Sequence, residues 1–239
     1  MKERGMIFNG EMVRAILDGR KTQTRRPFNW RRQPAMEMAE REDGSLWPWA
    51  EDCENGGDIW FNCPFGAVGD RIWVRETWAL LGNEDGCCVD WNDNLCKGDE
   101  KTAARIYRAS CEQRPGDYGL WSMPDNAYWK PHTENEKFEG TWRPSIHMPR
   151  WASRILLEIT DVRVERLNAI SEEDARAEGI IDGGCLNCGE PEPCGCDNPE
   201  PDATDAFAYL WQSIYGQENW NADPWVWVIE FKRVEGGAA

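Results

Sequence analysis

Residues 19–26 read Gly-Arg-Lys-Thr-Gln-Thr-Arg-Arg and begin a basic segment in which no acidic residue occurs before Met36. The whole chain has 27 Lys and Arg residues against 43 Asp and Glu residues, a net charge of −16. This excess of negative charge opposes binding to duplex nucleic acid. A polyanion could therefore bind only where basic residues are concentrated locally. The basic segment is a candidate for that contact, or its arginines pair with neighbouring carboxylates on an ordinary surface.

The aromatic composition is biased toward tryptophan, with 15 Trp against 5 Tyr and 7 Phe. Indole rings serve core packing, or they form stacking surfaces for planar bases. Tryptophans lie inside the basic segment and again among arginines near residue 142. The candidate residues for binding a nucleic acid or substrate are Arg20, Arg25, Arg26, Trp30, Trp142 and Arg143.

The sequence excludes several other classes of protein. No apolar run approaches the length of a membrane span, and the first residues lack the pattern of a secretory signal, so we expect a cytoplasmic protein with reduced thiols. No G-x-G-x-x-G, Walker A or H-E-x-x-H motif occurs. Two histidines, His132 and His147, are too few for most histidine-based catalytic sites.

Local patterns predict three helices. Asn9 is a suitable N-cap for a helix over 10–18, because apolar residues follow it at helical spacing until Gly19. Ser171 precedes three acidic residues and predicts a helix that ends near Gly179. The third helix is predicted over 203–215.

Alternating apolar residues predict strands over 71–78, 104–109, 152–167 and 224–234. Helices do not alternate regularly with these strands, so the sequence favours an α+β fold with a curved, mainly antiparallel sheet. We expect a single domain over 1–239 that carries irregular insertions. The insertions are placed at about 31–65, 82–101, 112–140 and 182–202.

Several stretches, taken in chain order, resemble the ASCH family. They are residues 19–26, the strand Gly69-Asp70-Arg71-Ile72-Trp73-Val74, the helix sequence over 171–179, and Trp-Val-Ile-Glu-Phe-Lys over 227–232. The resemblance implies a curved, PUA-like antiparallel β-barrel with flanking helices, similar to PUA and EVE RNA-binding domains. The four insertions have no counterpart in it. Families of this type are common in bacterial and phage genomes.

Some small ASCH proteins are N4-acetylcytidine amidohydrolases, and the resemblance implies three catalytic positions here. Thr24 corresponds to the nucleophile, Lys21 to its proton acceptor and Glu178 to the proton donor. A lysine acts as a base only when burial or cationic neighbours lower its pKa, so the rate is expected to rise as Lys21 loses its proton. Residues 21 and 24 point oppositely on a regular strand, so a shared site requires a turn or bulge. Otherwise Lys21 is an ordinary surface charge and Thr24 a strand residue.

Four of the ten cysteines crowd into one Gly- and Pro-rich stretch. Two pairs separated by a short spacer supply the four thiolates of a tetrahedral zinc site. The sequence therefore predicts structural zinc with no role in catalysis; the alternative is a loop of free cysteines. The predicted ligands are Cys185, Cys188, Cys194 and Cys196.

Together these observations predict a protein that recognises a nucleotide or single-stranded RNA and removes an N4-acyl group from cytidine. The expected partner is a modified nucleoside or single-stranded RNA, with neither duplex DNA nor a membrane. One alternative is a binding module without catalysis. Another is a scaffold whose acidic insertions bind a protein.

Overall fold

The computed structural model describes most of the chain. The described residues are 1–29, 37–52, 54–83, 87–92, 94–98, 100–114, 117–118, 142–181 and 203–234. They belong to two compact units. The first unit comprises residues 1–2, 18–71 and 158–233, and the second comprises 3–17, 72–157 and 234–239. The single domain expected from the sequence stays a prediction.

The chain is mixed α+β, as predicted. The strands are β1 (Glu3–Ile7), β2 (Gln23–Pro27), β3 (Glu37–Glu40), β4 (Leu46–Glu51), β5 (Asp58–Trp60), β6 (Arg71–Arg75), β7 (Trp78–Leu80), β8 (Arg105–Tyr107), β9 (Glu112–Arg114), β10 (Asp117–Tyr118), β11 (Leu156–Arg166) and β12 (Trp225–Arg233). The α-helices are α1 (Gly10–Leu17), α2 (Arg108–Cys111), α3 (Glu172–Ala177), α4 (Ala203–Tyr215) and α5 (Gln217–Asn221). Short 3-10 turns are η1 (Ser145–His147), η2 (Arg150–Ala152) and η3 (Leu167–Ala169).

The largest sheet has the strand order β1-β6-β11-β12-β2. Among the described strands this order does not close into a barrel, because β1 and β2 are its edges. Within the described residues, no helix is long and apolar enough to cross a membrane.

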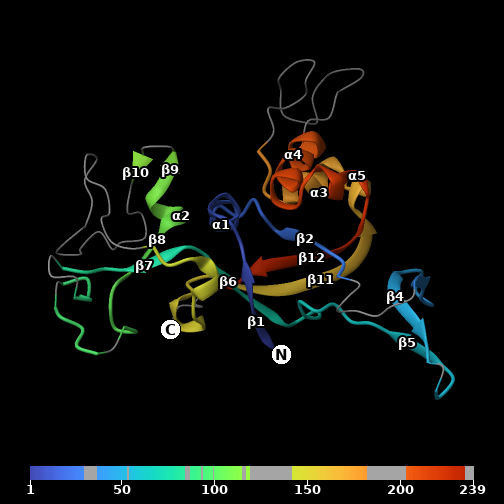
Figure 1. Ribbon diagram of the computed structural model, residues 1–239, viewed down its shortest axis with the longest axis horizontal. Helices are drawn as coiled ribbons and strands as arrows, with labels where there is room; N and C mark the ends of the chain where they lie inside the picture. Colours follow the sequence, from blue (N-terminus) through green and yellow to red (C-terminus); the bar gives the residue numbers. More distant parts are fainter. Residues whose placement is uncertain are drawn as a thin grey trace. The chain divides into compact units, whose positions relative to one another are not determined.

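In the first unit, β2 and β12 form a regular antiparallel pair, from Val226 opposite Pro27 to Glu230 opposite Gln23. Figure 1 shows these strands beside β11. β12 is rich in β-branched and aromatic residues, and four of its consecutive residues are buried. The predicted C-terminal strand is confirmed, and it fixes the position of β2 through the register.

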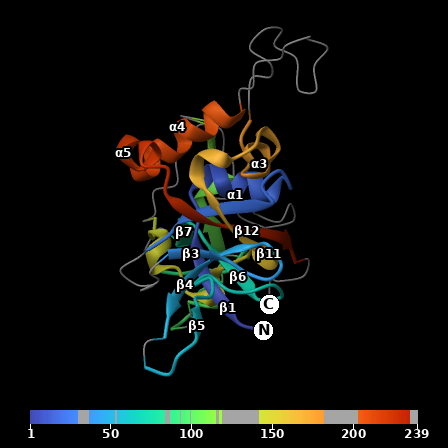
Figure 2. The same ribbon diagram turned by 90° about the vertical axis from the view of Figure 1, so that its right-hand side faces the viewer.

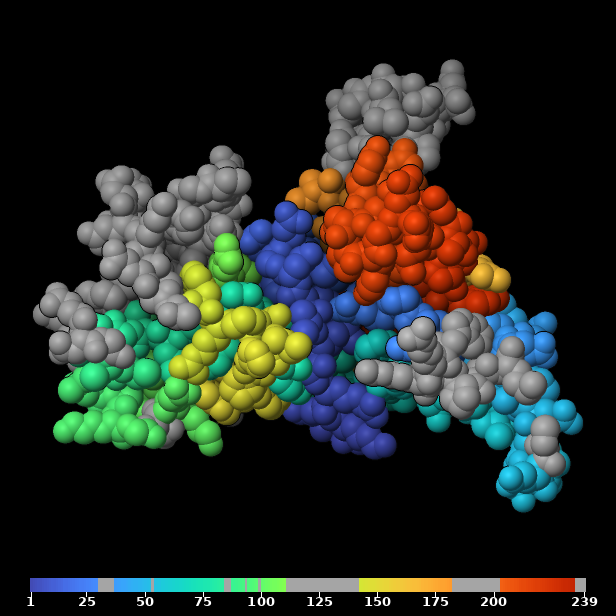
Figure 3. Space-filling model, in the orientation of Figure 1, coloured from blue at the N-terminus to red at the C-terminus, as the bar shows by residue number. Residues whose placement is uncertain are grey.

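Helices α3 and α4 pack against this part of the sheet (Figures 1 and 2). The residues buried along α4 are Ala203, Phe207 and Trp211, spaced by four, so they occupy one face of the helix. They share a core with Val226 and Val228 of β12. Figure 3 shows α4 and α5 gathered in one orange-red group.

The two predicted N-cap residues, Asn9 and Ser171, each accept a hydrogen bond from a backbone N–H in the first turn of their helix. The Asp174 backbone N–H donates to the Ser171 hydroxyl at 3.1 Å, which begins α3 at the predicted position. The Met12 N–H donates to the Asn9 side chain at 2.8 Å, which begins α1 in the second unit. The predicted helices over 10–18, 171–179 and 203–215 are confirmed.

The expectation that residues 31–65 lack regular structure is wrong for their described part, whereas their being an insertion stays a prediction. There β3, β4 and β5 form a three-stranded antiparallel sheet. Along β4, the half-buried residues Trp47 and Trp49 alternate with the buried residues Pro48 and Ala50. This period of two identifies a strand, but the prolines and glycines nearby hide it. The Arg41 guanidinium stabilises the sheet by stacking on Trp47, 4.0 Å from the ring centre.

The second unit contains a short hairpin in which β7 pairs with β8. The predicted strand over 71–78 is divided, with β6 ending at Arg75 and β7 beginning at Trp78. The strand predicted over 104–109 ends at Tyr107, because the chain turns into α2 at Arg108. The predicted strand over 152–167 begins at Leu156, after the turn η2.

Candidate active site

Lys21 and Glu178 form a buried ion pair in the first unit. The Lys21 Nζ donates to Glu178 Oε2 at 2.6 Å and to the Glu178 carbonyl oxygen at 2.7 Å. The side chains are 0% and 2% exposed. The ion pair thus joins two of the three positions implied by the ASCH resemblance, although they are 157 residues apart in the chain.

Backbone pairing brings the two residues together. Lys21 and Glu178 form an isolated antiparallel bridge, and the Thr22 N–H donates to the Ala177 carbonyl at 2.8 Å. On the other side of this segment, the N–H of Phe231 in β12 donates to the Thr22 carbonyl at 2.8 Å. The residues preceding β2 are therefore held between β12 and the end of α3, and this fixes the Lys21 backbone.

Arg25 and Asp174 extend the ion pair into a network. Arg25 Nη1 lies 3.5 Å from Glu178 Oε1, and its Nη2 donates to Asp174 Oδ2 at 2.9 Å and Glu165 Oε2 at 3.1 Å. Gln23 Nε2 donates to Asp174 Oδ1 at 2.7 Å. Each oxygen of Glu178 thus faces a different cation, which holds its carboxylate in one orientation.

The network continues from the buried ion pair toward solvent. Asp174 is 23% exposed and contacts Arg163 at 3.3 Å. Arg163 is 29% exposed and also pairs with Glu165 at 2.5 Å and with Glu230. The exposed fraction of the side chains thus increases from Lys21 and Glu178 to Asp174 and Arg163. The charges of Lys21 and Glu178 lie where water is least accessible and the effective dielectric constant is lowest.

Burial lowers the pKa of the Lys21 amine, because desolvation penalises its charged form. The carboxylate of Glu178 opposes this effect, whereas the charges of Arg26 and Arg25 add to it. Burial and two cationic neighbours thus act on Lys21 in the direction that a base requires. At a given pH a larger fraction of a lysine with a lowered pKa is neutral, so its amine is more often able to accept a proton than that of a free lysine.

Thr24 does not join the ion pair in this structure. It lies in β2 opposite Ile229, in a register without a bulge, and is 2% exposed. Its neighbours Gln23 and Arg25 both contact Asp174, so alternation along the strand directs Thr24 to the opposite face. Among the described residues, no hydrogen bond connects Thr24 with Lys21 or Glu178. The turn or bulge that a shared site requires is not present.

The prediction that Arg25 contacts nucleic acid is wrong. Its side chain is 0% exposed, and three carboxylates surround its guanidinium. The alternative, in which arginines pair with neighbouring carboxylates, is correct at this position. Arg26 is half-buried opposite Trp227, and Arg20 donates to the Gly179 carbonyl at 2.8 Å while pairing with Asp18.

The remaining predicted binding residues do not lie in this network. Trp142 is half-buried and belongs to the second unit, as does Arg143. Arg143 forms two hydrogen bonds to Glu100, at 3.0 and 2.7 Å, and stacks on Trp78 with 5.1 Å to the ring centre. Trp30 lies outside the described residues.

Two of the acidic residues around Arg25, Glu165 and Asp174, were not predicted as part of a site. Asp174 is identified by sequence only as a helix-start residue, and Glu165 only as part of a strand. The usable signal was a period of two over residues 21–25, because Lys21, Gln23 and Arg25 share one face and all contact α3 or its C-terminal cap.

Asp174 makes the network sensitive to acid. Burial raises its pKa, but the Gln23 hydrogen bond and the charges of Arg25 and Arg163 outweigh this effect, so the pKa lies below 3.8. A lowered folded-state pKa stabilises the protein above the unfolded value, and that stability is lost as the pH falls through the folded value. We expect the free energy of unfolding, measured in urea, to decrease less steeply below about pH 4 in Asp174→Asn than in the wild type. Asp205→Asn, at an exposed position of α4, is expected to follow the wild type; parallel acid limbs in all three proteins would contradict this assignment.

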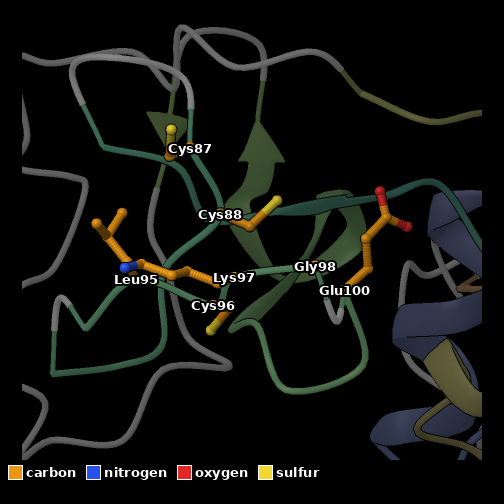
Figure 4. A pocket seen from close by; sticks show the side chains of 7 residues that line it. All are labelled: Cys87, Cys88, Leu95, Cys96, Lys97, Gly98 and Glu100. Carbon is orange, nitrogen blue, oxygen red and sulfur yellow. The ribbon is translucent and has the colours of Figure 1, made fainter.

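A second group of cysteines lies in the second unit. Cys87, Cys88 and Cys96 line a cavity of about 400 Å³ together with Glu100. Figure 4 shows their sulfur atoms pointing in different directions. Burial raises the pKa of the Cys88 thiol, and the charge of Glu100 adds to this effect. In the part of the chain that the structure describes, no three His, Cys, Asp or Glu side chains form a metal-binding group.

The predicted zinc ligands, Cys185, Cys188, Cys194 and Cys196, lie outside the described residues, and zinc stays a prediction. We expect protein purified under reducing conditions to contain about one zinc per chain, since four thiolates complete a structural site. The double variant Cys185→Ser/Cys188→Ser is expected to lose the metal by elemental analysis, whereas Cys87→Ser/Cys96→Ser retains it. Zinc-free wild-type protein would exclude the site.

Comparison with protein-family models, with curated proteins and with solved structures gives no match for this chain.

Proposed function

We propose that the protein hydrolyses an N4-acyl cytidine and that Lys21 and Glu178 carry the proton transfers. The observation that supports this proposal is the enclosed contact between the two side chains. Burying the Lys21–Glu178 ion pair costs desolvation free energy, and removing one partner would leave an uncompensated buried charge. A pair of this kind therefore serves either the stability of the fold or a function. A lowered lysine pKa beside a carboxylate is an arrangement suited to acid–base catalysis.

The proposed chemistry uses one proton shared by the pair. Transfer of this proton from Lys21 to Glu178 gives a neutral amine and a carboxylic acid, and burial penalises the charged form of the Lys21 amine. The amine then accepts a proton from the nucleophile, and the acid donates one to the departing cytosine N4. After these transfers the ion pair is restored. Water supplies the hydroxyl of the released carboxylic acid, so the net reaction is amide plus water to amine plus acid.

Arg25 is proposed as a positioning residue in this reaction. Its guanidinium faces the Glu178 oxygen that Lys21 leaves unoccupied. It also ties the carboxylate to α3 through Asp174. Since Arg25 is fully buried, its role is to orient Glu178 rather than to contact phosphate.

Access to the pair requires movement. Both side chains are closed off from solvent, so substrate binding must shift a neighbouring side chain or segment before the acyl group reaches Lys21. Catalytic hydrogen bonds in unliganded enzymes often tighten or rearrange only when substrate binds.

The role of Thr24 rests on the ASCH resemblance. If Thr24 forms an acyl intermediate, Thr24→Val abolishes cytidine release and Thr24→Ser retains part of it, because only serine keeps a hydroxyl. If water attacks directly, Thr24→Val retains activity, since it preserves the shape of the buried residue. Cytidine release from N4-acetylcytidine, followed by chromatography, separates these results. We expect loss in Thr24→Val; equal rates in all three proteins would remove Thr24 from the mechanism.

The second candidate is a nucleotide- or RNA-binding module without catalysis. The closed ion pair and the orientation of Thr24 favour it, because both also fit a purely structural network. This candidate predicts binding of N4-acetylcytidine or single-stranded RNA without turnover. The assay of the wild-type protein therefore decides between the two functions.

A further inference from the structure

A cavity of about 440 Å³ lies in the second unit, in a part of the molecule that the proposed hydrolysis does not use. Trp91, Thr102, Arg105, Tyr107 and Arg154 line it, together with the chain at 103–104. Its volume is within the range of small-molecule sites, which combine apolar walls with a few placed polar groups.

The β7–β8 hairpin places the polar groups of this cavity. Arg105 and Tyr107 are two residues apart on β8 and share one face, whereas Ile106 between them is fully buried on the other. Backbone hydrogen bonds hold the adjoining chain: the Leu81 N–H donates to the Ala104 carbonyl, the Val89 N–H to the Leu81 carbonyl, and the Ala104 N–H to the Val89 carbonyl. Trp91 packs against this cluster and remains half-buried, so part of its ring borders the cavity.

Arg154 is fixed before any ligand binds. Its Nε and Nη2 donate to the two oxygens of Glu76 at 2.9 and 3.0 Å, and its guanidinium stacks on Tyr107 at 4.1 Å from the ring centre. Glu76 is 1% exposed, so this contact is well shielded. The bidentate contact leaves Nη1 and the second Nη2 hydrogen available as donors.

Arg105 contributes a charge that no carboxylate balances among the described residues. Its Nη1 donates to the Trp151 carbonyl at 2.6 Å, which orients the guanidinium without neutralising it. Glu76 offsets the charge of Arg154, so the described groups around the cavity keep one positive charge from Arg105. In a protein with a net charge of −16, this local positive charge favours an anionic ligand over a cationic one.

We propose that this cavity binds a nucleoside monophosphate. The phosphate contacts Arg105 and the remaining donors of Arg154, because guanidinium groups recognise phosphate through paired N–H donors. The base stacks on Trp91, whose ring is rigid and half-exposed. The site is independent of the Lys21–Glu178 pair, and the inference goes beyond the proposed function.

Isothermal titration calorimetry of the full chain with AMP and CMP tests this proposal, with adenosine, cytidine and inorganic phosphate as separate probes. We expect one monophosphate per chain, bound more tightly than either the nucleoside or phosphate alone. Arg105→Gln is expected to weaken monophosphate binding about tenfold while leaving nucleoside binding unchanged. Trp91→Leu is expected to weaken both, since it removes the stacking surface but keeps an apolar side chain.

Arg150→Gln is the matched control, because Arg150 belongs to the same unit and pairs with Glu3 at an exposed position. It is expected to bind like the wild type. Circular dichroism melts establish that each variant is folded. The proposal is overturned if the wild type binds no monophosphate below about 5 mM, if phosphate alone binds equally well, or if Arg105→Gln binds like Arg150→Gln.

Discussion

Lys21→Met is expected to reduce cytidine release from N4-acetylcytidine by about 10²–10⁴-fold, because it removes the group that is proposed to accept the nucleophile's proton. Methionine has a similar length and no charge, so the shape of the buried site is largely kept. The KM is expected to change little, since Lys21 is assigned to proton transfer and not to ground-state binding.

Lys232→Met is the control for this loss. Lys232 also lies next to a carboxylate, with its Nζ 2.8 Å from Glu158 Oε1, but its side chain is 63% exposed. The variant is expected to retain the wild-type rate. Equal loss in the two variants would indicate a general effect of removing charge and would exclude a specific role for Lys21.

Glu178→Leu is expected to lower the free energy of unfolding by about 3–5 kcal/mol, because it leaves the Lys21 amine buried without a counter-charge. The double variant Lys21→Met/Glu178→Leu is expected to be more stable than Glu178→Leu, since apolar residues of similar volume replace the whole ion pair. Urea unfolding measures these differences, and a double-mutant cycle gives the coupling between the two residues.

The exposed pair of Lys232 and Glu158 provides the comparison for stability as well. Glu158→Gln is expected to change the free energy of unfolding by no more than about 1 kcal/mol, because exposed ion pairs contribute little. A similarly small change in Glu178→Leu would mean that water or another group compensates Lys21, and the ion pair would then lack the assigned energetic importance.

Local sequence patterns predicted much of the fold because the interactions behind them are local. Asn9 and Ser171 cap their helices through residues three positions away, and the spacing within 203–215 marks one buried face. The sheet that includes β4 was missed because Pro48 and the neighbouring glycines conceal its alternation. The strand at 104–109 was extended too far, since nothing at Arg108 signals the turn into α2.

The site was less predictable because its contacts join distant segments. The resemblance alone related Lys21 to Glu178, and no pattern in the chain shows that Asp174 meets Arg25. That contact depends on the register of β2 against β12 and on where α3 lies, which are long-range properties. The basic composition of 19–26 suggested an exposed anion site, but composition does not tell whether a cation faces solvent or a buried carboxylate.

Contact between Lys21 and Glu178 also changes the expected effect of pH on the reaction. In the proposed mechanism the active state holds one proton shared by the pair, so activity is lost when the pair loses that proton, rather than gained when Lys21 alone is deprotonated. Because burial lowers the pKa of Lys21, this alkaline loss is expected below 10.5, the usual value for lysine.

The pH dependence of kcat/KM for cytidine release from N4-acetylcytidine tests the central claim most directly. The shared-proton account predicts turnover by the wild type at neutral pH, a decline at alkaline pH with a midpoint below 10.5, and no such decline in the residual rate of Lys21→Met. A wild-type protein with no turnover at any pH, or the same alkaline profile in both proteins, would contradict the assignment of Lys21 and Glu178 as the proton-transfer pair.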